Sequence, residues 1–431
     1  VIYTVQANQV MRTAWAVLLA GAWLSVASAE PLTLEAALAT VADPHPDRLI
    51  AESDLAIARA DRDQAASKQD FHLFLDGALA GGEGDVGGWR ANNIGRVVAR
   101  KPLLDFGRSS QAVAAADQEV AARQTALFHV QSLRRIDIMA RYFDVLLADM
   151  QYVADNEFMA VAYVSWDNAK DRHEVGQISQ PELLKLEADY QNIRERREAS
   201  LQRMRSTRQK LAHAMYRPGS LPAELVEPAL PDNARPVAEY ESLLPWVLEK
   251  NPRVHTLQSQ LTAADARIAA VRAERNPVLD AEVVGADYSR FSNTRDNISA
   301  GLAFMIPLYQ GGRVDARVAR ELAQKERSTA ELEKLKLELA DSLLATLQEI
   351  EWLRSSGRVA ADRQIDYRDW ALERARAEYE LELKTNLGNS MAETQVAALR
   401  RKQVDYQLAL ALARLEAMSG GNLPPVGETG K

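Results

Sequence analysis

A length of 431 residues would allow two or three ordinary domains, but glycine and proline are few and clustered, so most of the chain has the composition of long helices. The formal net charge of -8 argues against a nucleic-acid-binding protein, which needs a basic surface. The absence of cysteine excludes disulfides, thiolate metal sites, lipid-modified cysteine and a thiol nucleophile within these residues.

Residues 11–29 have the three zones of a secretory signal peptide. Arg12 precedes an apolar run, and the segment ends in the small residues Ala27, Ser28 and Ala29. We therefore expect cleavage after Ala29, and we interpret residues 1–10 as an upstream extension of the reading frame. A retained N-terminal helix is the alternative. Export of an acidic chain without cysteine predicts the periplasm or the outer membrane of a Gram-negative bacterium.

The rest of the chain contains the same order of elements twice, as repeat 1 (30–216) and repeat 2 (237–420). Each repeat has a helix that opens near a proline, a β-hairpin, a very long helix, a glycine turn and a second long helix. The proline-rich segment 217–236 cannot form a long helix and predicts an extended strap between the repeats. Residues 421–431 are expected to form a flexible tail.

The two predicted hairpins, 72–100 and 278–306, have strands with two different faces. In the last strand, Ile298, Ala300, Leu302, Phe304 and Ile306 alternate with small or polar residues. Runs of this length match the roughly 9–11 residues of a tilted transmembrane β-strand. Four strands cannot close a barrel, so strands from several subunits must combine. A soluble antiparallel sheet is the alternative.

The hairpins contain polar loops with aromatic residues beside them. Residues 81–88 are rich in glycine and predict a surface-exposed loop rather than a phosphate loop, because they lie between strands and lack the required lysine. We interpret Trp89, Tyr288 and Phe291 as aromatics of the membrane interface.

Each second strand runs into a similar sequence, Lys101–Arg108 in repeat 1 and Pro307–Arg313 in repeat 2. Proline ends a strand ladder and glycine permits a sharp change of direction. The predicted strand-to-helix junctions therefore include the following residues: Pro102, Gly107, Pro307, Gly311 and Gly312. Because Phe106 occupies the position of Gly311, we expect the two junctions to bend differently.

The helices that follow are too long for a globular core. From Arg108 to Gly176 the predicted helix spans ~98 Å, and from Arg313 to Lys384 it spans ~108 Å. In each repeat the two shorter helices together have almost the same length, ~90 Å and ~82 Å. Apolar residues three and four positions apart within 136–153 and 183–193 predict coiled-coil seams, so each glycine turn is the tip of an antiparallel helical hairpin.

Neither catalysis nor a cofactor is indicated by the sequence. The six histidines are scattered, and none forms an i, i+4 pair or lies beside a suitable carboxylate motif. We expect no enzymatic activity, no catalytic residue, no metal and no cofactor.

At this point the chain resembles the TolC-like outer-membrane efflux proteins. The resemblance rests on LTLEAAL (32–38), Asn251-Pro252, the two junctions, the tip turns Val175-Gly176 and Leu387-Gly388, and the doubled order of elements. It implies a mainly α fold with membrane β-strands, in which a homotrimer combines two structural repeats per chain into a 12-strand β-barrel and a periplasmic α-helical tunnel. Such a channel passes substrates from an inner-membrane pump and a periplasmic adaptor, also called a membrane fusion protein, to the cell exterior, as in tripartite efflux or type I secretion.

The resemblance also implies roles for the helical tips. The residues expected to dock on the adaptor are Val175, Gly176, Gln177, Asn386, Leu387 and Gly388. The alternative is that these glycines only end helices. Candidate residues for the periplasmic entrance are Glu182, Asn389 and Glu393, where carboxylates repeated around an axis would repel one another. The alternative is that each glutamate is an ordinary solvated helix residue.

Two other classes of protein remain as rivals. A periplasmic coiled-coil scaffold or adaptor would not form a pore, but it would need one helical hairpin flanked by compact β-domains. An enzyme with a helical lid would need a convergent polar site.

Overall fold

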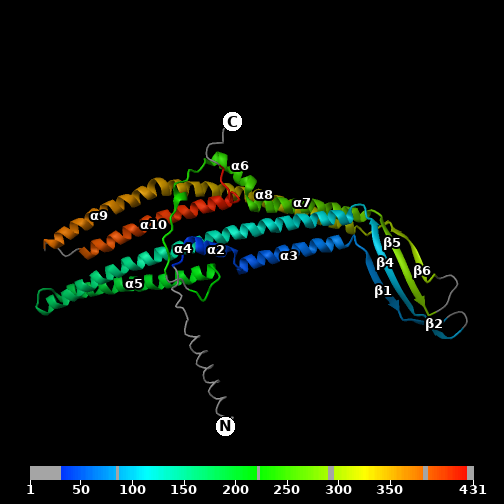
Figure 1. The fold of residues 1–431 in the computed structure, drawn as a ribbon, viewed down its shortest axis with the longest axis horizontal. Helices are drawn as coiled ribbons and strands as arrows, with labels where there is room; N and C mark the ends of the chain where they lie inside the picture. Colours follow the sequence, from blue (N-terminus) through cyan, green and yellow to red (C-terminus); the bar gives the residue numbers. More distant parts are fainter. Residues whose placement is uncertain (1–30, 84–86, 221–223, 290–295, 382–386, 425–431) are drawn as a thin grey trace, which may run out of the picture.

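The computed structural model describes residues 31–83, 87–220, 224–289, 296–381 and 387–424. The predicted signal peptide, Phe291, Lys384, Asn386 and most of the predicted tail lie outside these ranges. The described chain is elongated, with a β-sheet at one end and two helical tips at the other (Figure 1).

Repeat 1 contains two short helical segments, a four-strand segment and three long helices. Its elements are α2 (Leu34–Ala39), the 3-10 turn η1 (Thr40–Ala42), α3 (Pro46–Ser67), β1 (His72–Ala78), β2 (Gly81–Glu83), β3 (Trp89–Ala91), β4 (Ile94–Leu104), α4 (Arg108–Glu174) and α5 (Gln180–Ala214). With 67 residues, α4 extends from the sheet to the first tip, a length of ~100 Å.

Repeat 2 follows a strap that crosses the helices at mid-length (Figure 1). The elements are η2 (Pro231–Ala234) in the strap, then α6 (Tyr240–Lys250), α7 (Pro252–Arg272), η3 (Ala273–Arg275), β5 (Val278–Tyr288), β6 (Ile298–Met305), α8 (Arg313–Trp352), η4 (Leu353–Gly357), α9 (Arg358–Glu380) and α10 (Leu387–Met418). The predicted fold class, mainly helical with few strands, is confirmed.

The main sheet is antiparallel, in the order β1-β4-β5-β6, and the pairing of β4 with β5 joins the two repeats. A second, two-stranded sheet pairs β2 with β3, where the sequence predicted only a loop. β1 and β6 form the two edges of the main sheet.

One structural expectation was wrong in repeat 2. The sequence predicted an unbroken helix from Arg313 to Lys384, but a π-helical turn, η4, separates α8 from α9. The Ser355 hydroxyl donates to the carbonyl of Glu351 (2.7 Å) and competes with the backbone for it. Gly357 ends the turn, and glycine is a weak helix former. Both features favour a local widening of the helix at this point.

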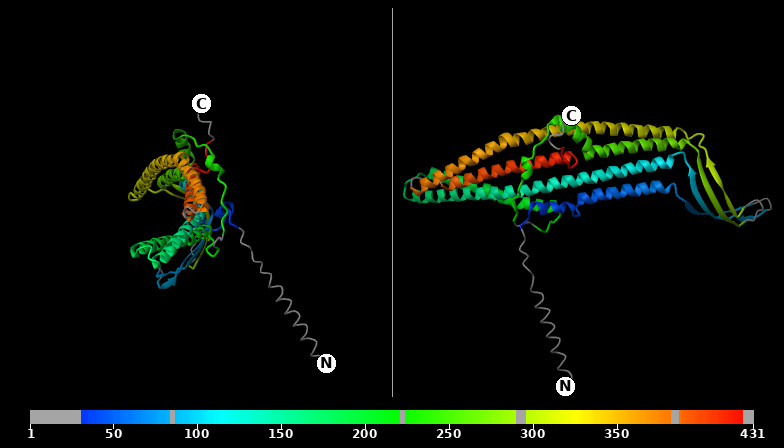
Figure 2. Two further views of the ribbon diagram at one scale, coloured as in Figure 1. Left: turned by 90° about the vertical axis from the view of Figure 1, so that its left-hand side faces the viewer. Right: turned by 45° about the horizontal axis from the view of Figure 1, so that its top comes forward.

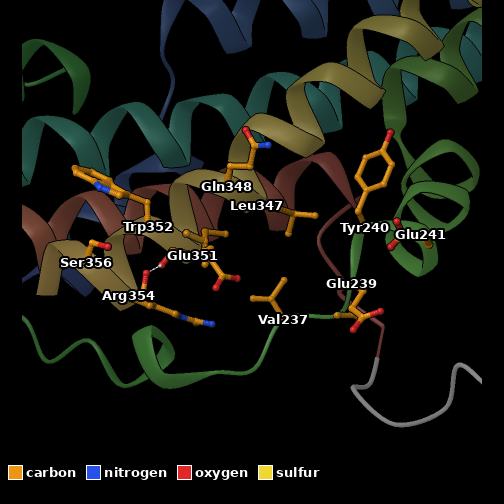
Figure 3. A pocket seen from close by; sticks show the side chains of 13 residues that line it. Val237, Glu239, Tyr240, Glu241, Leu347, Gln348, Glu351, Trp352, Arg354 and Ser356 are labelled. Atoms are coloured by element: carbon orange, nitrogen blue, oxygen red, sulfur yellow. Dashed lines mark hydrogen bonds between the residues drawn. The ribbon is translucent and has the colours of Figure 1, made fainter. Parts of the chain in front are cut away.

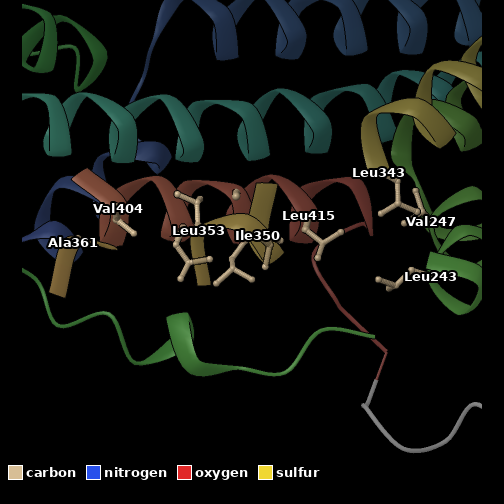
Figure 4. Packing of buried hydrophobic residues seen from close by; sticks show 11 residues of the cluster. Leu243, Val247, Leu343, Ile350, Leu353, Ala361, Val404 and Leu415 are labelled. Carbon is tan, nitrogen blue, oxygen red and sulfur yellow. The ribbon is translucent and has the colours of Figure 1, made fainter. Parts of the chain in front are cut away.

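The core lies at mid-length, where the strap crosses. One cluster contains Tyr142, Phe143, Leu211 and Tyr406, so it joins α4 and α5 to α10. The rings of Phe143 and Tyr406 stack with centroids 4.4 Å apart. A second cluster contains Ile350, Leu353 and Leu408, and it joins α8 and η4 to α10 (Figure 4).

Tyr142 ties the strap to this core. Leu32 and Leu225 form a parallel bridge, in which the Val226 amide donates to the Leu32 carbonyl (2.9 Å). The Tyr142 hydroxyl donates to the Leu32 carbonyl (2.8 Å) and shares this proton with the Val226 carbonyl. A single buried hydroxyl therefore holds both the first residues of repeat 1 and the strap against α4.

Replacing Tyr142 with Phe should destabilise the protein by about 1–2 kcal/mol, because the carbonyls of Leu32 and Val226 lose the hydrogen bond from the buried phenol. Thermal unfolding in detergent measures the change. The matched control is Tyr367→Phe, whose side chain is exposed and which should leave the transition unchanged. Equal stability of wild type and Tyr142→Phe would contradict the role of this hydroxyl.

The same hydroxyl should make stability fall at high pH. Burial raises the pKa of Tyr142 from 10.0 to about 12. Below pH 10 the phenol is neutral in both the folded and the unfolded chain. Between pH 10 and pH 12 the unfolded chain loses its proton first, so stability falls in this window. Unfolding of Tyr142→Phe should show a smaller loss over the same window than the wild type.

Candidate functional site

The main sheet has one apolar and one polar face. Directly paired residues of neighbouring strands lie on the same face of a sheet. The register places the following apolar residues on one face: Leu73, Leu75, Val97, Ala99, Leu279, Ala281, Val283, Ile298, Ala300, Leu302 and Phe304. Two charged residues share this face, Lys101 opposite Ala281 toward the helices and Asp287 opposite Gly95 toward the loops. No helix covers this face in the described chain, and Leu75 and Phe304 are 84% and 74% exposed. An uncovered apolar sheet of this kind needs a nonaqueous surrounding.

The polar face contains the residues between those of the apolar face. Arg96 forms an ion pair with Asp76, and Arg100 lies 3.5 Å from Glu282 in the neighbouring strand. Asp280 also lies on this face, opposite Pro102. Cross-strand charge pairs suit a surface in contact with water.

The polar face continues into the concave surface of the helices. Viewed along the long axis, the helices follow an arc (Figure 2). A cavity of about 680 Å³ is lined by residues of all four helices below the sheet and by the polar face itself. Its lining includes Lys68 of α3, Glu119 of α4, Arg267 of α7, Arg317 of α8 and Asp280 of β5. Sheet and helices thus share one charged inner wall.

The strand-to-helix junctions have the same backbone conformation in both repeats. Phe106 and Gly107 have φ of 53° and 91°, and Gly311 and Gly312 have φ of 60° and 73°. Both junctions thus place two successive residues in the left-handed region of φ, although repeat 1 has Phe106 where repeat 2 has Gly311. The left-handed conformation of Phe106 costs about 1–2 kcal/mol. Asp105 stabilises it, because its carboxylate accepts from the amides of Gly107 (3.2 Å) and Ser109 (2.8 Å).

The prolines of the two junctions lie at different places. Pro307 follows the end of β6, whereas Pro102 lies inside β4, which continues to Leu104 rather than ending at residue 100. The register shifts between Pro102 and Leu104, and a proline without an amide proton is tolerated at such a bulge.

The first tip is a turn between α4 and α5. The amides of Gly176 and Gln177 donate to the carbonyls of His173 (2.9 Å) and Arg172 (2.8 Å), which is the Schellman ending of a helix. Gly176 has φ of 74°, and an added Cβ would meet no atom within 4 Å. Val175 is 68% exposed. Val175 and Gly176 therefore present an open surface at the end of the molecule.

Glu182 has a local structural partner at this tip. Its carboxylate accepts from the amide (2.9 Å) and the hydroxyl (2.9 Å) of Ser179, as in a helix capping box. These hydrogen bonds, the backbone one first, lower the pKa of Glu182. The carboxylate that the sequence assigned to the entrance thus also starts α5.

The second tip packs against the first hairpin. A Cβ added to Gly388 would lie 2.5 Å from Cγ2 of Val161, so this glycine lets α10 approach α4 closely. Glu393 forms an ion pair with Arg368 of α9, and Asn389 is exposed one turn before it. Leu387 is half-buried. Sequence reasoning missed Val161 and Arg368, because only the packing of two hairpins brings them to these residues.

Aromatic residues join α4 to α5 above the first tip. The rings of Trp166 and Tyr190 stack with centroids 5.1 Å apart, and Tyr163 lies edge-on to both. The Lys170 ammonium lies 4.2 Å from the Trp166 ring centroid. Farther from the tip, Arg208 forms a bidentate ion pair with Asp149 (2.5 and 2.8 Å). The spacing of Tyr163 and Trp166 on one helical face was the signal in the sequence for this cluster.

Within the described ranges, no helix combines the length and hydrophobicity of a membrane span. The same ranges contain no group of three or more histidine, aspartate or glutamate side chains arranged to bind a metal ion.

Comparisons with known proteins agree with this geometry. Residues 243–421, most of repeat 2, match the family model described as outer membrane efflux protein. Among curated protein sequences, none matches the chain significantly.

Solved structures share the fold across almost the whole chain. The CmeC outer membrane channel of Campylobacter jejuni is 13% identical, with a TM-score of 0.74, and the match covers 90% of this chain and 86% of that one. A membrane protein from Pseudomonas aeruginosa is 17% identical, with a TM-score of 0.73 and coverage of 90% of both chains. The outer membrane protein VceC from Vibrio cholerae is 17% identical, with a TM-score of 0.70 and coverage of 91% and 97%. The resemblance predicted from the sequence is thereby confirmed.

The contact at the second tip can be tested by substitution. Gly388→Ala should destabilise the protein by about 1–3 kcal/mol, because the new methyl group overlaps Val161. Val161→Ala in the same chain should recover most of this loss by removing the overlapping methyl groups. Thermal unfolding of the two single variants and the double variant measures both effects. Additive losses in the double variant would contradict the contact.

Proposed function

We propose that this chain, as a member of the outer membrane efflux proteins, forms a passive export duct through which substrates leave the cell. The observation that carries the proposal is the sheet with two faces. One face is apolar and uncovered, as lipid contact requires. The other is charged and continuous with the concave helical wall, as an aqueous passage requires.

A closed barrel needs more than one copy of the chain. β1 and β6 are edge strands of an open four-stranded sheet, and unpaired strand edges are not stable within lipid. Pairing β6 of one copy with β1 of the next closes the ring. The family resemblance supports three copies, hence a 12-strand barrel, with the helices forming a tunnel in the periplasm.

The partners are proposed from the family and from the position of the tips. An adaptor that binds at Val175, Gly176 and Gln177 and at Leu387 and Gly388 would connect the duct to an inner-membrane pump, which supplies the energy. The first of these turns is exposed at the end of the molecule. Glu393 and Asn389, with Glu182, stay candidates for the entrance, where Glu393 is paired with Arg368.

The rival proposal, a periplasmic scaffold without a pore, is less consistent with the uncovered apolar face. A soluble sheet would bury this face against helices, whereas Leu302 is 65% exposed.

The direct test is a conductance measurement on the purified full chain in planar bilayers, combined with membrane fractionation of the cells that produce it. We expect outer-membrane recovery and stable pores. Recovery in the soluble periplasm, or bilayers without conductance, would reject the duct.

Leu302→Lys should strongly reduce the amount of protein in the outer membrane. A lysine on the lipid face costs about 2–4 kcal/mol near the bilayer centre. The matched control is Ser299→Lys, which places the same charge on the polar face of the same strand. Membrane fractionation measures the amount of protein in the outer membrane, and the heat-dependent shift in gel mobility measures its assembly. Equal assembly of the two variants would contradict the assignment of the faces.

Gly176→Asp should leave assembly intact but reduce export. A residue with φ of 74° is strained unless it is glycine, so Gly176→Asn is the control, with similar shape and strain but no charge. We expect an efflux defect of about tenfold or more in resistance for the aspartate variant, corresponding to about 1.4 kcal/mol of lost docking energy. Normal export by both variants would reject docking at this turn.

A further inference from the structure

The chain has two free lateral edges. α3 and α5 pack on α4, whereas α8 and α9 pack on α7, α10 and the segments next to them. α3 and α5 therefore form one edge, and α8 and α9 form the other. Along the long axis, β1 continues beyond the end of α3, and β6 continues beyond the start of α8 (Figure 1). The edges of the sheet therefore continue the edges of the helical part.

A groove lies beside the α8 edge at mid-length. It has a volume of about 850 Å³. One side is formed by the end of the strap and the start of α6, and the other side by the end of α8 and by η4 (Figure 3). Leu347, Ile350 and Val237 line it, and Ile350 belongs to the mid-length core below (Figure 4). Trp352, 57% exposed, stands at its rim.

The rim of this groove is acidic. Glu239, Glu241 and Glu351 line it, and none of the three carboxylates has an ion-pair partner within the described chain. Arg354 is the only cationic residue of the lining, and its guanidinium donates to the Arg235 carbonyl. Arg354 also interacts electrostatically with Glu351. With three carboxylates and one guanidinium, the lining keeps a net negative charge around its apolar residues.

The opposite edge is basic at the end of α5. Arg203, Arg205 and Lys210 are exposed, and these three have no ion-pair partner in the described ranges. Other arginines of α5 bind α4 instead: Arg208 pairs with Asp149, and Arg196 lies 2.8 Å from Asp155. Packing within the chain therefore accounts for those arginines but not for the three exposed residues.

The acidic groove and the basic end both lie near the middle of the molecule. Leu211, next to Lys210, packs in one cluster with Tyr406 of α10. The contact of Gly357 with Val404 and the ion pair of Arg414 with Glu349 place Glu351 beside about residue 411 of α10. At 1.5 Å per residue, Glu351 and Lys210 differ in height by ~9 Å, and Arg205 and Arg203 lie a further ~8–10 Å toward the tip.

We propose that the acidic groove of one copy binds the basic end of α5 of the next copy. This proposal rests on the ring of copies proposed above. In such a ring the α3–α5 edge of one copy faces the α8–α9 edge of its neighbour with opposite charge, and Lys210 is the basic residue nearest in height to Glu351. Complementary charge fixes the register of an interface and suppresses wrong pairings. The contact would thus set the relative height of neighbouring subunits at the middle of the tunnel.

Charge reversal tests this contact. The groove variant combines Glu239→Lys, Glu241→Lys and Glu351→Lys, and the helix variant combines Arg203→Glu, Arg205→Glu and Lys210→Glu. We expect each variant to increase the rate of subunit exchange between differently tagged assemblies in detergent by about tenfold or more, because like charges then face each other. The sixfold variant, with both sets reversed, should return the rate close to that of the wild type.

Two controls separate this contact from general effects of charge. Glu351→Lys alone is compared with Glu326→Lys, an exposed glutamate on the same helix ~37 Å away, which should not change the exchange rate. Exchange of the wild type should also rise with salt, because exposed charge pairs are screened.

The outcomes distinguish this proposal from the proposed function. Recovery by the sixfold variant supports the contact. The contact is overturned if the exchange rate is unchanged in both triple variants, or if the sixfold variant does not restore it. If such assemblies still conduct normally, the duct is left in place. A wild-type chain that neither assembles nor conducts overturns the duct, and the contact with it. A last outcome is that removal of residues 425–431 raises the exchange rate while the charge reversals leave it unchanged. This result would assign the groove to the chain's own end and would also overturn the contact.

Discussion

The packing of α4 is the constraint on which the other elements depend. A helix of 67 residues cannot bury its apolar residues against one partner, so it contacts α3 and α5 of its own repeat and α7 and α10 of the other. Its middle carries Tyr142 and Phe143, which bind the strap and stack on Tyr406. Its ends meet the sheet and the first tip. The positions of both hairpins, of the strap and of the sheet therefore follow from contacts with one helix.

The sheet is subject to the opposite constraint, because the chain supplies almost nothing to cover it. Leu75, Ile298 and Phe304 stay exposed, while the charged residues Asp76, Arg96, Arg100, Asp280 and Glu282 lie on the other face. An apolar outside and a charged inside are the two requirements of a passage through lipid. Helices and sheet share the inner wall, since the cavity below the strands is lined by both. The inner wall formed by the strands therefore continues along the helices.

The two hairpins differ in how they are held. The first is joined by stacked aromatic rings and by ion pairs such as that of Arg208 with Asp149. The second is interrupted by the π-helical turn at Leu353–Gly357 and is joined by ion pairs of Arg368 with Glu393 and of Arg401 with Asp362. Gly388 brings this second hairpin against Val161 of the first, so the tips are coupled through a direct contact. A change at one tip therefore has a physical route to the other.

Much of this architecture follows from local patterns in the chain. Alternation with a period of two predicts the strands and their two faces, and long stretches without proline or glycine predict helices of the observed length, because both signals depend on near neighbours in sequence. Other features needed the tertiary structure. The left-handed Phe106 depends on Asp105 and on the geometry of the turn. The contact of Gly388 with Val161 joins residues from different repeats. The common reason is that backbone irregularities and close approaches are decided by what a residue packs against, and sequence periodicity carries no record of that partner.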